Sequence, residues 1–315
     1  MKNELFEIHT LPELATAIRN GSPVVALESA LITHGLPYPQ NLEVAQELEG
    51  IIRSAGAVPA TVALLNRKVH IGLSAAELRR LAQSPRPRKV SLRDLAACIL
   101  DGEDGGTTVA ATAHLARHAG IEVFATGGIG GVHRGQPFDV SADLPLLAST
   151  PIAVVCAGAK SILDLPLTLE WLETHGVPVV GFQTTQFPAF YSRESGLPVD
   201  FRAETADEVA AFARAHWGLG LRSAVLVGVP IAAEAGIAHD AVEGAIRQAL
   251  ADAERDGIHG KAITPYLLAR VSQLTEGESL QANLALLRRN AQVGAELAVS
   301  LAAVRQSEYE QECVE

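Results

Sequence analysis

The sequence contains little cysteine and no excess of positive charge. Its 315 residues include three cysteines, Cys98, Cys156 and Cys313, and no C-x-x-C pair. This odd, scattered set excludes a disulfide framework and a cysteine-based zinc site, so we expect a reducing compartment, the cytoplasm. Acidic residues outnumber basic residues by 36 to 25, which gives a net charge of −11. That balance argues against a nucleic-acid partner, because affinity for phosphate backbones comes mainly from clustered Lys and Arg.

Long apolar runs are also missing. The longest uncharged apolar stretch, residues 144–159, contains two prolines and falls short of the roughly 18 residues needed to span a bilayer. The N-terminal segment is interrupted by Glu4, Glu7 and Glu13, so it lacks the apolar core of a signal peptide. We therefore expect neither a membrane span nor export. Hydrophobic residues still make up 48% of the chain, which is ample for a large core.

Short apolar runs alternate with amphipathic segments along the chain. Runs rich in β-branched residues predict buried strands at residues 24–27, 121–125, 152–156, 177–182 and 224–228. Apolar residues at 3.6-residue spacing predict helices at residues 41–55, 107–118, 142–149, 165–174, 239–255, 264–274 and 279–304. This order predicts an α/β fold, a three-layer α/β/α sandwich with a largely parallel or mixed central sheet. No linker or repeat divides the chain, so we expect a single domain over residues 1–315.

Glu28 is the only formally charged residue between Arg19 and Glu43. It directly follows the predicted strand at residues 24–27, and open α/β sheets place their ligand crevices at the carboxyl ends of strands. A carboxyl group that is partly desolvated there has a raised pKa and can act as a general acid or base. The alternative is a structural glutamate held by backbone donors or by an arginine.

Lys160 is similarly isolated, because no other charge lies between Asp143 and Asp164. The chain has only five lysines against twenty arginines. A lysine in an apolar setting, in a chain that otherwise uses arginine, indicates chemistry that a guanidinium cannot do, namely amine attack on a carbonyl carbon. The alternative is a lysine that extends from a strand end into solvent.

Three further segments indicate charged ligands, and each has a simpler explanation. Residues 85–94 form the only basic cluster, which is either an anion site or a solvated loop before a helix. Residues 105–109 open a predicted helix whose N–H groups either hold an anion or are simply capped. Asp139 and Asp143 flank Ser141, and this group could bind a hard cation with few protein ligands and several waters. Ser141 is also a typical helix N-cap residue, which explains its hydroxyl equally well.

Longer stretches of the sequence occur together in a familiar order. They are ALESALITHGLPYPQN, KVSLRDLA, GGTTVAAT, FATGGIGGVHRG, FDVSADL, CAGAKSILDLPLTLEWLET, GFQTTQFPAFYSRESGLP, TPYLLARV and SLQANLALL. With these motifs the chain resembles the pseudouridine-5'-phosphate glycosidases, a family that includes indigoidine synthase A-like proteins. The resemblance covers roughly residues 25–304.

The resemblance implies reversible cleavage of the C–C glycosidic bond of pseudouridine 5'-phosphate to uracil and ribose 5-phosphate. It implies that Lys160 forms a Schiff base at C1' and that Glu28 is the proton donor. It implies a divalent metal, expected to be Mn²⁺, bound by Asp139, and a homotrimer. The substrate-binding residues that it implies are Lys89, Thr108, Val109, Thr126, His133, Ser141, Ala142, Asp143 and Asn283.

Two other functions fit the same residues. One is another Schiff-base lyase that acts on a sugar phosphate, such as an aldolase. The other is a non-catalytic phosphosugar-binding protein, or an accessory protein of pigment biosynthesis. Cleavage of a carbon-linked base needs both an acid and a lysine. The leaving carbon must be protonated as the bond breaks, and an iminium at C1' provides a route that a pair of carboxylates lacks.

Overall fold

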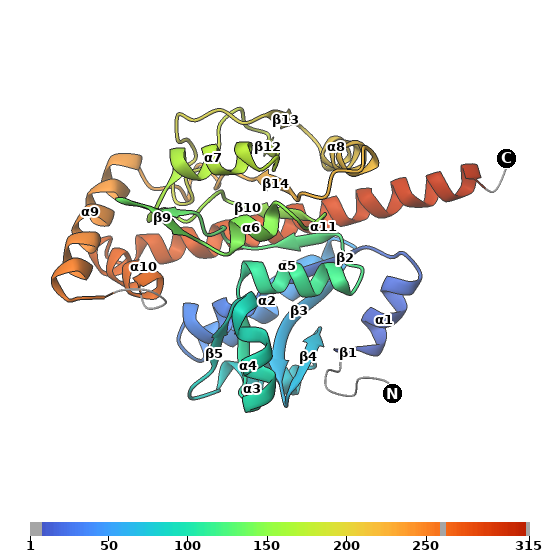
Figure 1. Ribbon diagram of the computed structural model, residues 1–315, viewed down its shortest axis with the longest axis horizontal. Helices are drawn as coiled ribbons and strands as arrows, with labels where there is room; N and C mark the ends of the chain where they lie inside the picture. Colours follow the sequence, from blue (N-terminus) through green and yellow to red (C-terminus); the bar gives the residue numbers. More distant parts are fainter. Residues whose placement is uncertain (1–7, 259–262, 313–315) are drawn as a thin grey trace.

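Figure 1 shows the computed structural model, which describes residues 8–258 and 263–312, so Cys313 lies outside the described residues. Its centre is an 11-stranded sheet in the order β1-β4-β3-β2-β7-β10-β14-β12-β13, with β6 paired to β3 and β5 paired to β6. The strands of this sheet are β1 (Ile8–Thr10), β2 (Val24–Leu27), β3 (Val58–Leu65), β4 (Lys68–Ile71), β5 (Arg88–Val90), β6 (Gly105–Thr107), β7 (Val123–Ala125), β10 (Ala153–Cys156), β12 (Val179–Phe182), β13 (Phe201–Ala203) and β14 (Val225–Gly228).

Most neighbouring strands in this sheet run parallel, and β3 pairs antiparallel with β4 and β6. The central strands β2, β10 and β14 are buried along their whole length, which accounts for their continuous apolar sequences. A small antiparallel sheet lies beside the main one and consists of β8 (Val132–His133), β9 (Gln136–Val140) and β11 (Leu163–Asp164).

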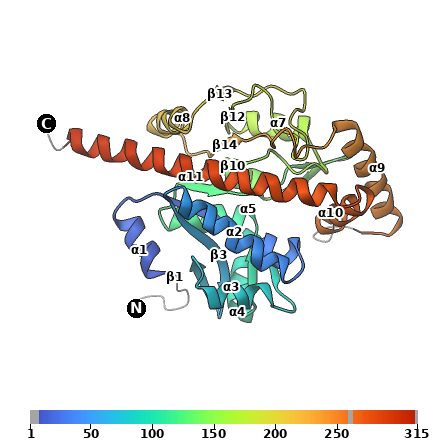
Figure 2. The same ribbon diagram turned by 180° about the vertical axis from the view of Figure 1, so that it is seen from behind.

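Helices cover both faces of the main sheet. The helices are α1 (Pro12–Arg19), α2 (Gln40–Ser54), α3 (Ala75–Ala82), α4 (Leu95–Asp101), α5 (Val109–His118), α6 (Asp143–Leu147), α7 (Leu165–Thr174), α8 (Ala206–Gly218), α9 (His239–Arg255), α10 (Ile263–Leu274) and α11 (Glu278–Glu312). In Figure 1, α5 and α6 lie in front of the sheet, and in Figure 2, from behind, α2 and the long α11 lie toward the viewer. The predicted three-layer α/β/α sandwich with a largely parallel sheet is therefore confirmed.

The helix predicted over residues 107–118 begins later than expected. Gly105, Gly106 and Thr107 form strand β6, and α5 begins at Val109. Gly106 pairs with Ala63 of β3, and a Cβ on it would lie 2.1 Å from Thr33 Oγ1. The two glycines therefore allow close strand packing, and the prediction that they open the helix is wrong.

Two further predictions from composition concern membranes and cysteine. In residues 8–258 and 263–312, no helix is both long and apolar enough to cross a membrane. Cys98 and Cys156 are unpaired and buried. Burial raises the pKa of Cys98 to about 11 and that of Cys156 to about 12. Both thiols are therefore neutral at physiological pH and pack as small apolar side chains.

Candidate active site

A cavity of about 510 Å³ lies at the carboxyl ends of the parallel strands β2, β7 and β10. Its walls come from the loops after these strands, from β5, and from helices α10 and α11 near the C-terminus of the chain. Nine of the residues predicted from the sequence line it: Glu28, Lys89, Thr108, His133, Ser141, Ala142, Asp143, Lys160 and Asn283. Thr126, Val109 and Asp139 do not line it, but Thr126 and Val109 are next in the chain to the lining residues Gly127 and Thr108, and Asp139 contacts the lining residue His133.

Glu28 and Thr126 are placed by neighbouring strands. Glu28 directly follows β2 and Thr126 directly follows β7, and these two strands pair in parallel. The Thr126 hydroxyl donates a hydrogen bond to the Glu28 carboxylate. Burial raises the pKa of Glu28, and the opposing effects of Lys160 and of the Thr126 hydrogen bond do not cancel it. Glu28 therefore holds a proton at higher pH than an ordinary glutamate, as a general acid requires.

Lys160 is placed by a tight turn after β10. Gly158 in this turn has φ +86°, and a Cβ there would lie 2.1 Å from the carbonyl oxygen of Pro188. The amide of Lys160 donates to the Ile129 carbonyl at 3.0 Å, so the turn is joined to the glycine-rich loop after β7. The Lys160 charge lowers the pKa of Glu28 across the cavity. An amine and a desolvated acid thus line the same cavity from the loops after β10 and β2, with β7 between these strands.

Asp143 joins the glycine-rich loop to helix α5. Its carboxylate accepts hydrogen bonds from the amides of Gly130 at 2.7 Å and Ala110 at 2.9 Å. A Cβ on Gly130 would lie 2.2 Å from Ser141 Oγ, so a side chain does not fit there. Ser141 Oγ accepts from the Asp143 amide at 3.3 Å just before α6, but the N-cap residue of α6 is Ala142, so the prediction that Ser141 is the N-cap is wrong by one residue. The Asp143 carboxylate is therefore committed to backbone donors and holds the cavity wall in place.

The N-terminus of α5 borders the cavity at Thr108. Thr108 occupies the N-cap position, and its hydroxyl is buried without a hydrogen-bond partner although it borders the cavity. Val109 follows and is 1% exposed in the core, so it does not line the cavity. A helix N-terminus with free N–H groups and a positive dipole end favours an anion.

Lys89 is the basic-cluster residue that reaches this end of the cavity. Its neighbour Arg88 extends from the other side of β5 and pairs with Asp101 at 2.9 Å and with Glu103. Arg86 is exposed. Successive side chains of a strand point to opposite faces, so Lys89 faces the cavity while Arg88 points away from it.

His34 lines the same region as Lys89, and sequence reasoning assigned it no role. Burial lowers the pKa of His34, and the positive charge of Lys89 lowers it further. The side chain is therefore neutral near pH 7 and can donate or accept a hydrogen bond. It belongs to the motif THG, but the sequence does not show that this turn lies beside β5.

His133 and Asp139 lie together at another edge of the cavity. His133 Nε2 is buried without a hydrogen-bond partner, and Nδ1 is 3.3 Å from the Asp139 carboxylate. The Asp139 side chain is 54% exposed and does not line the cavity itself. One accessible carboxylate with space for water is the kind of site that binds a hard, mostly hydrated cation. It does not resemble a metal site built from many protein ligands.

Helix α11 closes the cavity and fixes the glycine-rich loop. Asn283 borders the cavity, and Asn290 two turns later donates to the carbonyls of Thr126 at 2.7 Å and Gly127 at 3.3 Å. Tyr191 and Ser279 also line it, and sequence reasoning assigned neither a role. Burial raises the pKa of Tyr191, with a hydrogen bond to Ser279 opposing this effect, so the phenol stays neutral.

Comparisons with known proteins identify the family and the fold. A family model described as indigoidine synthase A like protein matches residues 13–300. The chain belongs to this family. A protein of Caldanaerobacter subterraneus named pseudouridine-5'-phosphate glycosidase is 53% identical over 291 residues, 92% of this chain and 95% of its own length. A protein of Chloroflexus aurantiacus with the same name is 55% identical over 297 residues, 92% and 97% of the two chains.

Two solved structures have the same fold. The prealnumycin C-glycosynthase AlnA, in complex with ribulose 5-phosphate, is 40% identical and superposes with a TM-score of 0.88 over 95% of this chain and 98% of its own. An indigoidine synthase A-like protein of Thermotoga maritima is 36% identical, with a TM-score of 0.88 over 96% and 99%. The resemblance seen in the sequence motifs is therefore confirmed at the level of family and fold.

Proposed function

We propose that the chain is a pseudouridine-5'-phosphate glycosidase that reversibly cleaves the C–C glycosidic bond to uracil and ribose 5-phosphate. The observation that carries this proposal is the pairing of Lys160 with Glu28, whose pKa is raised, across one cavity that also contains Lys89. Relatives more than half identical bear this enzyme's name. The similar AlnA structure contains a pentulose phosphate.

The first step of the proposed mechanism opens the sugar ring. The amine of Lys160 attacks C1', the bond from C1' to the ring oxygen breaks, and the proton lost by the amine goes to that oxygen. This produces an open-chain sugar that is joined to Lys160 through nitrogen and still carries uracil at C1'.

The second step breaks the carbon–carbon bond. The nitrogen lone pair of Lys160 forms a double bond to C1', and the electron pair of the C1'–C5 bond passes to uracil, which takes a proton at C5 from Glu28. Water then adds to the iminium and releases ribose 5-phosphate, while Glu28 recovers a proton. The net reaction consumes one water and leaves both side chains unchanged.

We place the substrate phosphate near Lys89, His34 and the N-terminus of α5. This end of the cavity provides a cation, a neutral ring and the partnerless hydroxyl of Thr108. A phosphate dianion needs such a local positive region because the whole chain carries a net charge of −11. Ser141, Ala142 and Asn283 remain proposed contacts for the rest of the substrate.

The residues around Asp139 fit a divalent cation such as Mn²⁺. Asp139 would hold it through one carboxylate oxygen, and the exposure of that side chain leaves room for coordinated water. Such an ion supplies positive charge that stabilises an anionic oxygen. His133 accompanies Asp139, and its Nε2 is buried without a hydrogen-bond partner among the described residues.

We also propose a homotrimer located in the cytoplasm. Phe138, next to Asp139 on β9, is fully exposed, which supports a subunit contact that covers it. Light scattering of the purified protein tests this proposal, and a monomeric mass would contradict it.

The experiment for the main proposal follows uracil by chromatography after pseudouridine 5'-phosphate is added to the purified protein with Mn²⁺. We expect equal amounts of uracil and ribose 5-phosphate. Aldehyde release from sugar phosphates without uracil would indicate another Schiff-base lyase. Binding of ribose 5-phosphate without turnover would indicate a non-catalytic protein. Either result would overturn the proposal.

A further inference from the structure

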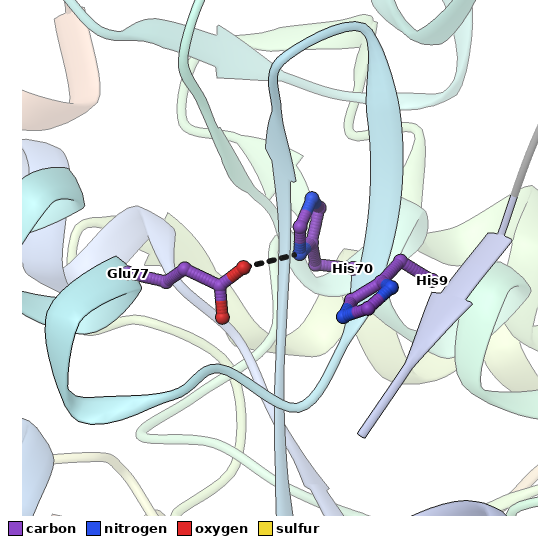
Figure 3. A group of neighbouring side chains, drawn as sticks. All are labelled: His9, His70 and Glu77. Carbon is purple, nitrogen blue, oxygen red and sulfur yellow. Dashed lines mark ion pairs between the residues drawn. The ribbon is translucent and has the colours of Figure 1, made fainter. Parts of the chain in front are cut away.

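Two histidines and a glutamate meet at the edge of the main sheet, outside the cavity that contains Glu28 and Lys160. His9 on β1 pairs in register with His70 on the parallel strand β4, and their rings are 4.9 Å apart. Glu77 in the first turn of α3 directs a carboxylate oxygen to within 3.2 Å of His70 Nδ1. Figure 3 shows the Glu77 carboxylate pointing at the His70 ring, with the His9 ring beside it. None of the three lines the 510 Å³ cavity.

His70 is the buried member of this cluster. Its side chain is 6% exposed, and apart from a contact with the Leu65 backbone, neither ring nitrogen makes a hydrogen bond with the described residues. The 3.2 Å contact with Glu77 is close enough for an ion pair but lacks hydrogen-bond geometry. Buried polar groups normally have well-aligned hydrogen-bond partners, so an imidazole with only these contacts has a ring nitrogen to offer to a further partner.

We propose that His9, His70 and Glu77 form a zinc site. One ligand atom from each residue lies within 4.8 Å of the other two. Four-coordinate zinc with bonds of about 2.1 Å separates its ligand atoms by about 3.4 Å. The pair from His70 and Glu77 already has this spacing, so only the partly exposed His9 must move closer.

The surroundings of Glu77 support the same assignment. Its second oxygen accepts hydrogen bonds from the amide of Ser74 at 2.8 Å and from the Ser74 hydroxyl at 2.7 Å. This capping box fixes the carboxylate and leaves the first oxygen directed at His70. Hydrogen bonds that orient a ligand from outside are typical of metal sites. Two imidazoles and one carboxylate are ligands that zinc accepts, with water in the fourth position.

Such an ion would join β1, β4 and α3. Strand β1 has three residues and lies at the end of the sheet order, so backbone pairing alone attaches it weakly. Zinc bound by these three residues would attach β1 to the rest of the sheet, so its loss should lower stability and leave the catalytic cavity unchanged.

The test uses the full chain carrying Asp139→Ala, which removes the proposed active-site cation. The protein is stripped with a chelator, and Zn²⁺ is then titrated in competition with a chromophoric chelator. We expect one zinc per chain. Both His9→Ala and Glu77→Gln should weaken binding at least about tenfold, because even outer-shell changes cost that much. Gln keeps an acceptor for Ser74, so Glu77→Gln removes the ligand charge with little change to the capping box.

His114→Ala is the matched control, because His114 is an exposed histidine on α5, away from the cluster. It should leave zinc affinity unchanged. Zinc should also raise Tm by a few degrees in the parent and by much less in His9→Ala. Bound Co²⁺ should give the intense visible bands of four-coordinate cobalt in the parent only. Absence of a zinc equivalent, or equal affinity in the parent, His9→Ala and Glu77→Gln, would overturn the proposal.

Discussion

Replacing Lys89 with alanine should remove most of the preference for a phosphorylated substrate. Lys89 lines the cavity, and its charge lowers the pKa of both His34 and Glu28, so it acts on the space that these residues enclose. A hydrogen bond to a charged group contributes about 1.5–3 kcal/mol. We therefore expect kcat/KM for pseudouridine 5'-phosphate to fall by about 10- to 150-fold, at 1.36 kcal/mol per factor of ten.

The assay compares kcat/KM for pseudouridine 5'-phosphate and for free pseudouridine in the wild type and the variant. Activity on the free nucleoside should change little, because it has no phosphate to lose a contact. Arg86→Ala is the control, since Arg86 is exposed on the same segment and should preserve the preference. If Lys89→Ala kept the wild-type preference, the phosphate would lie elsewhere, and residues 105–108 would be the first alternative.

The same variant should shift the pH profile. Lys89 lowers the pKa of Glu28, so its removal raises that pKa further above the ordinary value. Glu28 donates a proton only in its acid form, which then persists to higher pH. The alkaline limb of kcat in Lys89→Ala should accordingly move upward, and a downward shift would contradict the assignment of Glu28 as the acid.

The remaining predictions concern the acid, the metal and the glycine-rich loop. Glu28→Gln should lower kcat by about 10²- to 10⁴-fold and abolish the alkaline limb that reports loss of the Glu28 proton; a retained limb would assign it to another group. Chelation should abolish activity and Mn²⁺ should restore it, while Asp139→Ala should need much more Mn²⁺; unchanged metal dependence would exclude Asp139 as ligand. Gly130→Ala places a Cβ 2.2 Å from Ser141 Oγ and should reduce the free energy of unfolding by about 1–3 kcal/mol, in contrast to Gly50→Ala, which meets no atom within 4 Å.

The sequence predicted the parts of the fold whose pattern is local. Strand β2 and helices α7 and α9 have the predicted bounds, because their apolar spacing and flanking Gly or Pro residues are unambiguous. The β3–β4 hairpin was not predicted. Its turn uses Asn66 and Arg67, both with positive φ, and contains no glycine, so the usual turn signal is absent.

The site was predictable where isolated charge marks a strand end, as at Glu28 and Lys160. Other members depend on contacts between distant segments. Nothing in the sequence indicates that the Asp143 carboxylate accepts hydrogen bonds from the amides of Gly130 and Ala110. His34 likewise becomes part of the cavity only because its turn lies beside β5.

The most direct test of the account is reductive trapping of the sugar on Lys160. Borohydride added while the enzyme turns over pseudouridine 5'-phosphate should fix a reduced ribose 5-phosphate to the peptide that contains Lys160, as mass spectrometry would detect. Lys160→Arg should form no adduct and have no activity, because a guanidinium keeps the charge but cannot attack carbon as the amine does. An active enzyme without an adduct, an adduct on another lysine, or appreciable activity in Lys160→Arg would contradict the account.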